Sequence, residues 1–313
     1  MIYFQWQIFA EVYIMNNSAN GTWKNKKVLF IGDSLTAKRI YPEVVKEILG
    51  IQTFYHCKGG AGLVSMVDGE SGVDGKYDNY TDAQGILRPL TAKDVADMDA
   101  IVFFGGYNSR HLSIGKIGDK YEGKGKNETV AAVMQYCIDR IYEELRKANN
   151  LTCKLLIVTV DYAGKYAWWD IDGRGEADGQ GSGKTLEAMA NIQAETAQHN
   201  GIPVCDLFHT SGINPHTWCV FAASAEPIDP LYSPYRLNEK GEPISSERIR
   251  YVKGESYYQW RDGKVVLEEY IGYASARYNA PYPYNADQLH KSEAGYRRIG
   301  ETIAGALISA YGN

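Results

Sequence analysis

The chain has 313 residues, of which 44% are hydrophobic and 23% are charged, and its formal net charge is −5 at pH 7. This composition is typical of a globular protein and excludes an intrinsically disordered chain. The negative charge and the lack of a Lys/Arg-rich block argue against nucleic-acid binding, because a phosphate backbone requires a basic surface.

Residues 1–17, the main part of the amino-terminal segment 1–22, are apolar and aromatic. The segment lacks the positive charges that open a signal peptide, and two glutamines and a glutamate interrupt it. It is too short to span a bilayer, and we expect no membrane span elsewhere. We interpret it as an N-terminal extension; an added strand, a docking segment and translation from Met15 remain open. The sequence does not indicate a cellular compartment.

Residues 23–313 are predicted to form a domain in which buried strands alternate with amphipathic helices. Short apolar runs predict five strands, over residues 27–32, 52–57, 100–106, 154–160 and 202–208. Apolar residues at helical spacing predict helices over 41–49, 127–150 (with Asn127 available as N-cap), 183–201 and 292–312. Strands that are apolar throughout belong to a parallel sheet covered on both faces. We therefore predict an α/β fold, a three-layer α/β/α sandwich with a five-stranded parallel sheet.

Residues 213–286 break this alternation. They contain ten of the 24 tyrosines together with several prolines and glycines. The segment "WRDGKV" predicts a β-hairpin with Asp262 and Gly263 in its turn. We interpret residues 213–286 as a tyrosine-rich, β-rich insertion before the last helix.

The five cysteines are widely spaced and include no C-x-x-C pair, so they indicate neither a disulfide framework nor a zinc site. We expect buried thiols. The spacing of His209, His216 and Cys219 fits no common zinc motif, and no metal site is predicted.

Residues 178–189, "DGQGSGKTLEAM", partly match a phosphate-binding loop. The match fails at Asp178, which stands where the first glycine is needed, and the preceding predicted strand lies too far back. We interpret Lys184 and Thr185 as the start of an ordinary helix.

Polar residues follow the predicted strands at the places where a parallel α/β sheet binds ligands, the carboxyl ends of its strands. Ser34 follows the first strand, the glycine-rich segment 57–62 follows the second, and Asn108 follows the third. Asp287 and His290 come just before the last helix. Taken singly, each has a structural explanation, and a serine in such a turn often caps a helix.

Together these residues match the parts of a serine hydrolase. Ser34 would be the nucleophile, His290 the general base, and Asp287 would orient the imidazole. The backbone N–H groups of Ser34 and Gly62 and the side-chain amide of Asn108 would bind the oxyanion. Four neighbouring residues are predicted to contact substrate: Asp33, Tyr107, Trp168 and Trp169. The two tryptophans fit a surface anchor equally well.

The ordered motifs G-D-S-L-T, glycine loop, G-x-N and D-x-x-H resemble those of the SGNH (GDSL) hydrolase family. Its four namesake residues correspond to Ser34, Gly62, Asn108 and His290. The resemblance implies a flavodoxin-like sheet, ester hydrolysis through an acyl-serine, and no metal or organic cofactor.

Two departures from the family pattern are visible. The third motif commonly ends in aspartate, where this chain has Ser109, which puts the geometry of that loop in doubt. In the second motif, Gly59 or Gly60 could be the oxyanion donor instead of Gly62.

The sequence thus predicts a carboxylic ester hydrolase. Because residues 165–181 and 213–286 are rich in aromatic and polar side chains, we expect an acetyl ester on a carbohydrate as substrate. The alternative is a non-catalytic or dual-role carbohydrate-recognition module on a surface or virion-tail assembly. Expected partners are a small-molecule or glycan ester, without nucleic acid.

Overall fold

The computed structural model describes residues 22–70, 87–109, 112–163, 185–214, 216–221, 238–240, 242, 255–261, 264–269 and 289–312. The predicted N-terminal extension, apart from Thr22, lies outside these residues. The chain divides into two compact units. The first comprises Met1–Asp161, Leu186–Gly212 and Tyr296–Asn313, and the second comprises Tyr162–Thr185 and Ile213–Gly295.

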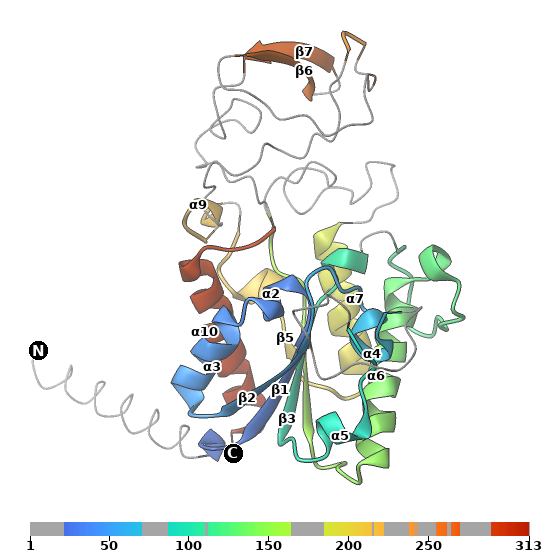
Figure 1. Cartoon of the computed structure of the whole chain (residues 1–313), viewed down its shortest axis with the longest axis vertical. Helices are drawn as coiled ribbons and strands as arrows, with labels where there is room; N and C mark the ends of the chain where they lie inside the picture. The colour runs from blue at the N-terminus through green and yellow to red at the C-terminus, as the bar shows by residue number, and fades with distance from the viewer. Residues whose placement is uncertain are drawn as a thin grey trace, which may run out of the picture. The chain divides into compact units, whose positions relative to one another are not determined.

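The first unit contains a parallel sheet of five strands: β1 (Lys27–Gly32), β2 (Gln52–Cys57), β3 (Ala100–Phe104), β4 (Lys154–Val158) and β5 (Val204–Cys205). Their order in the sheet is β2-β1-β3-β4-β5, which is the flavodoxin-like arrangement (Figure 1). The predicted parallel sheet is confirmed. The order reverses between β1 and β3, and sheets of this type bind ligands beyond the carboxyl ends at such a reversal.

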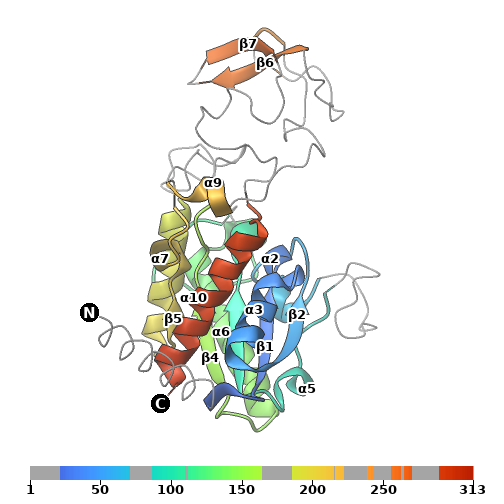
Figure 2. The ribbon, with the colours of Figure 1, turned by 90° about the vertical axis from the view of Figure 1, so that its left-hand side faces the viewer.

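Helices cover both faces of the sheet. Helices α3 (Ile40–Leu49) and α10 (Glu293–Tyr311) lie on one face, and α6 (Val130–Lys147) and α7 (Leu186–His199) lie on the other (Figures 1 and 2). A Cβ placed on Gly300 of α10 would lie 2.6 Å from the Cβ of Val44, so α10 and α3 pack closely. The predicted three-layer α/β/α sandwich is confirmed.

Shorter elements complete the described chain: α2 (Ser34–Ala37), α4 (Ser65–Asp68), α5 (Ala92–Val95), η1 (Tyr107–Ser109), η2 (Gly125–Asn127), α8 (Leu207–Thr210) and α9 (Trp218–Phe221). In the second unit, β6 (Ser256–Arg261) and β7 (Lys264–Glu269) pair antiparallel. Arg261 is opposite Lys264, which confirms the predicted hairpin.

The hydrophobic core follows the periodicity of the sequence. The residues of β1 and β3 are buried almost throughout, as expected for central strands with both faces covered. The predicted apolar stripe of α6 is buried in full: Val130, Met134, Cys137, Ile141 and Leu145. The stripe predicted for α10 is buried at Tyr296, Ile299, Ile303 and Leu307, whereas Ala310 is exposed. Cys57, Cys137, Cys153 and Cys205 are buried thiols outside any disulfide, as predicted.

Several predicted boundaries are wrong. Strands β3 and β4 each end two residues early, and β5 stops at Cys205 instead of residue 208. Asp206 is the reason for the latter, because its side chain accepts a hydrogen bond from the His209 N–H and so starts helix α8. Thr129, not Asn127, caps α6 by accepting the Ala132 N–H at 3.1 Å. Within the described part of the chain, no helix is long and apolar enough to cross a membrane.

Candidate active site

Ser34 is the first residue of α2, immediately beyond the end of β1. The residue that caps α2 is Asp33, whose buried carboxylate accepts the Leu35 N–H at 3.0 Å. The structural explanation of Ser34 as a helix cap is therefore wrong. Gly32 permits the close approach of β3 to the end of β1, because a Cβ there would lie 2.6 Å from the carbonyl oxygen of Phe104 on β3.

The glycine loop after β2 begins beside this serine. The Lys58 N–H donates to the Gly32 carbonyl oxygen at 3.2 Å, which holds the start of the loop against the end of β1. A Cβ placed on Gly59 would lie 3.9 Å from the Cβ of Ser34. Gly60 has a φ of +83°, a conformation that favours glycine. The loop therefore runs directly past Ser34.

The far end of the glycine loop meets Asn108. The side-chain amide of Asn108 donates to the Ala61 carbonyl oxygen at 3.1 Å. That oxygen belongs to the same peptide unit as the Gly62 N–H, so Asn108 holds the orientation of the peptide that carries this donor. The structure thus places Asn108 beside Gly62 at one end of the glycine loop and Ser34 beside Gly59 at the other end.

Tyr107 does not face a substrate, because its side chain is fully buried. Its hydroxyl accepts a hydrogen bond from the Asp161 N–H at 2.7 Å and lies against both the carbonyl and the carboxylate oxygen of Asp161. Burial, with the nearby Asp161 carboxylate, raises the pKa of Tyr107, so the phenol stays protonated. Tyr107 is better described as a support for the loop that carries Asn108. The buried Asp33 likewise supports α2 rather than facing a substrate.

Gln193 is a second support that the sequence analysis missed. It is fully buried on α7, donates to the Gly105 carbonyl oxygen at 2.7 Å and accepts the Val160 N–H at 2.8 Å. It thereby joins the loop after β3 to the end of β4. The signal in the sequence is an amide side chain on the otherwise apolar face of a predicted helix.

His290 is partly exposed and lies in the second unit, three residues before the start of α10. Its neighbour Lys291 is buried and donates to the Leu289 carbonyl oxygen at 2.6 Å. Asp287, Trp168 and Trp169 lie outside the described residues.

A second D-x-x-H sequence, Asp206 to His209, lies after β5 in the first unit. His209 Nδ1 lies 2.9 Å from the Asp206 carboxylate, and His209 Nε2 lies 3.5 Å from the Glu187 carboxylate. A general base needs one ring nitrogen directed at the nucleophile. Since carboxylates flank both nitrogens of His209, this pair is not a candidate base.

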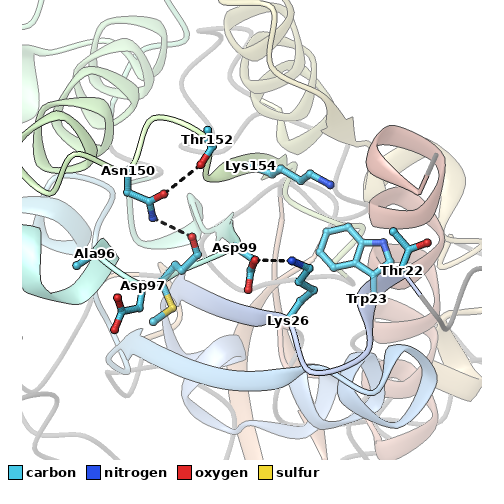
Figure 3. A pocket seen from close by; sticks show the side chains of 10 residues that line it. Thr22, Trp23, Lys26, Ala96, Asp97, Asp99, Asn150, Thr152 and Lys154 are labelled. Atoms are coloured by element: carbon cyan, nitrogen blue, oxygen red, sulfur yellow. Dashed lines mark hydrogen bonds and ion pairs between the residues drawn. The ribbon is translucent and has the colours of Figure 1, made fainter.

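A pocket of about 410 Å³ in the first unit lies at the opposite edge of the sheet (Figure 3). It is lined by Thr22, Trp23, Lys26, Ala96, Asp97, Met98, Asp99, Asn150, Thr152 and Lys154, which precede or open β1, β3 and β4. Lys26 and Asp99 form an ion pair of 2.8 Å across it (Figure 3). Because Ser34 and Asn108 follow the carboxyl ends of the strands, this pocket is separate from the candidate active site. No cluster of three metal-binding side chains is found among the described residues.

Comparisons with known proteins bear on the fold. No protein-family model and no curated protein sequence matches the chain. A possible lipase from Chitinophaga pinensis has a similar structure, with 17% identity, a TM-score of 0.50, and coverage of 91% of this chain and 98% of that chain. A GDSL-like lipase from Bacteroides thetaiotaomicron is 14% identical, with a TM-score of 0.38 and coverage of 95% and 98%.

A catalytic mutant of an acetylxylan esterase from Geobacillus stearothermophilus is 10% identical, with a TM-score of 0.40 and coverage of 91% and 95%. Identities this low bear on the fold and not on the activity. Together with the strand order, the likeness to the possible lipase shows that the chain has a flavodoxin-like α/β/α fold.

Proposed function

We propose that this chain is a carboxylic ester hydrolase of the SGNH type with Ser34 as its nucleophile. The observation that carries the proposal is the meeting of three loops where the strand order reverses. Ser34 follows β1, the glycine loop after β2 passes beside it, and Asn108 after β3 binds that loop at Ala61. Nucleophile and oxyanion donors are needed at such a point.

The proposed reaction begins when Ser34 Oγ attacks the acyl carbonyl carbon while His290 takes the hydroxyl proton. Asp287 orients the imidazole and stabilises its protonated form. The tetrahedral intermediate then collapses, the C–O bond to the alcohol breaks, and His290 returns the proton to the leaving oxygen. Water, deprotonated by His290, attacks acyl-Ser34 and releases the carboxylic acid.

The oxyanion would be bound by the Ser34 N–H, the Gly62 N–H and the Asn108 amide. A primary amide carries two hydrogens. One of them on Asn108 binds the Ala61 carbonyl. Because the C=O and N–H of a trans peptide point in opposite directions, the Asn108 amide would reach an oxyanion shared with the Gly62 N–H only after this hydrogen bond opens. Gly59 and Gly60 remain alternatives to Gly62 as the oxyanion donor. Of these two alternatives, Gly59 is supported by its placement beside Ser34.

For the substrate we propose an acetyl ester on a carbohydrate. The support is the aromatic and polar composition of residues 165–181 and 213–286, which suits stacking against sugar rings. The proposal does not depend on a metal or an organic cofactor.

The experiment compares hydrolysis of p-nitrophenyl acetate, p-nitrophenyl octanoate and an acetylated oligosaccharide by the parent and by Ser34→Ala. Ser113→Ala serves as control, since Ser113 is an exposed serine. We expect turnover of the acetyl substrates that is lost only in Ser34→Ala, with fluorophosphonate labelling of the parent and of Ser113→Ala but not of Ser34→Ala. Turnover that survives in Ser34→Ala contradicts the proposed nucleophile. Glycan binding with no turnover by the parent would instead favour the recognition module.

A further inference from the structure

Ser109 connects the two loops that hold the proposed oxyanion donors. It is 3% exposed, and its Oγ accepts a hydrogen bond from the backbone N–H of Leu63 at 2.9 Å. Leu63 follows Gly62 in the glycine loop, and Ser109 follows Asn108 in the turn η1. The hydrogen bond therefore links the residue that follows Gly62 to the residue that follows Asn108.

The glycine loop is fixed on its other side as well. The thiol of Cys137 on α6 donates to the Leu63 carbonyl oxygen at 3.3 Å, and both residues are buried. The Gly62 carbonyl oxygen accepts the Met66 N–H at 3.1 Å, which ties it to the turn that opens α4. With α6 and α4 holding the glycine loop, the Leu63–Ser109 hydrogen bond adds a second link, beside the Asn108–Ala61 hydrogen bond, between this loop and η1.

Ser109 is itself held in place by its own turn. Its N–H donates to the Gly106 carbonyl oxygen at 2.8 Å. Gly106 has a φ of +141°, and a Cβ there would lie 2.8 Å from Nε2 of Gln193, so this turn packs tightly on the α7 support. The position of the Ser109 hydroxyl is consequently fixed by its own turn, and the hydroxyl does not shift when Leu63 moves.

The contact between Ser109 and Gly62 is also tight. A Cβ placed on Gly62 would lie 3.3 Å from Ser109 Oγ and 4.0 Å from the Asn108 carbonyl oxygen. A displacement of either loop by a fraction of an ångström therefore changes how the Gly62 N–H and the Asn108 amide approach a common point. Oxyanion stabilisation depends steeply on this geometry, because the donors must be aimed before charge develops.

We propose that Ser109 is a positioning residue for ester hydrolysis, whose hydroxyl sets the separation between the Gly62 and Asn108 donors through the Leu63 N–H. The inference rests on the proposed function. It assigns a task to Ser109, the residue that follows Asn108 in the third motif. Ser109 needs no contact with substrate in this role.

The test is a double-mutant cycle between Ser109 and Asn108, measured with p-nitrophenyl acetate. Ser109→Ala is expected to lower kcat by about 10-fold or more with little change in KM, since oxyanion donors act in the transition state. In an Asn108→Ala background, Ser109→Ala should lower kcat by about threefold or less, because one of the two aligned oxyanion donors has already been removed. Ser113→Ala, which removes an exposed hydroxyl from a neighbouring segment, should match the parent.

Hydrogen exchange at the Leu63 amide supplies a readout independent of activity. Exchange should accelerate in Ser109→Ala, while circular dichroism shows an intact fold. The inference is overturned if kcat of Ser109→Ala stays within about threefold of the parent, or if the Ser109 and Asn108 effects multiply in full. If Ser34→Ala retains turnover, the proposed function has failed instead; if Ser34→Ala is inactive and Ser109→Ala is normal, only this inference has failed.

Discussion

The carboxylate of Asp33 accepts the backbone N–H of Leu35 at 3.0 Å and caps helix α2. The start of the helix therefore does not depend on the hydroxyl of Ser34, the residue between them. The capping role in this turn therefore belongs to Asp33 and not to Ser34. It also means that the catalytic and the structural roles of this turn can be separated by mutation.

Ser34→Ala should abolish ester turnover and change the free energy of unfolding by less than about 0.5 kcal/mol. Asp33→Ala should instead destabilise the protein by about 1 kcal/mol or more, because α2 loses its cap and a buried N–H loses its acceptor. Urea unfolding of both variants, followed by circular dichroism, measures the difference. A loss of about 1 kcal/mol in Ser34→Ala would restore the capping role to the serine.

The two D-x-x-H sequences should respond differently to mutation. His290→Ala is expected to lower kcat by about 10³-fold or more, the scale of removing a general base from a catalytic triad. His209→Ala should leave kcat unchanged, because the ring of His209 lies between the Asp206 and Glu187 carboxylates. Steady-state kinetics on p-nitrophenyl acetate decides between them, and the reverse pattern would refute the assignment of the base.

Gln193→Leu should destabilise the fold and impair catalysis together. The substitution leaves the Gly105 carbonyl and the Val160 N–H without their buried partner, at a cost of about 2–4 kcal/mol. Because Gly105 opens the loop that carries Asn108, kcat should fall more than KM rises. Gln198→Leu, an exposed change on the same helix, is the matched control. Equal unfolding midpoints for the two variants would speak against the support role.

His56 should make the protein less stable in mild acid. Burial and, to a smaller extent, the nearby Arg88 guanidinium lower the pKa of His56 to about 4, while the Asp94 carboxylate opposes the shift. The unfolded chain binds this proton near pH 6.5 and the folded chain only near pH 4, so stability is lost as pH falls between these values. The loss attributable to His56 is about 2 kcal/mol at pH 5 relative to pH 7.5.

The measurement is urea unfolding of the parent and of His56→Phe at pH 7.5 and pH 5. The parent should lose more stability than the variant over this interval, since phenylalanine fills the site without titrating. His199→Phe, at an exposed position of α7, should behave as the parent. An unchanged pH dependence in His56→Phe would exclude His56 as its source.

The sequence by itself was sufficient for the architecture. Apolar runs located every strand of the sheet, and helical spacing located the long helices, because burial of a repeating face is a local property of the chain. The position of Ser34 at the end of the first strand followed in the same way. Helix and strand ends were less predictable, since competing caps such as Thr129 and Asp206 differ from their neighbours only in the hydrogen bond they make.

What only the tertiary structure decided is which residues support the site. Tyr107 was predicted to touch substrate, yet its ring is buried against Asp161. The link between Ser109 and Leu63 and the amide of Gln193 join segments far apart in the chain. Such contacts depend on how strands and loops are brought together in space, and neither hydrophobic periodicity nor motif spacing encodes them. Short sequence motifs therefore identify the proposed catalytic residues, whereas the residues that support them are identified only in the folded structure.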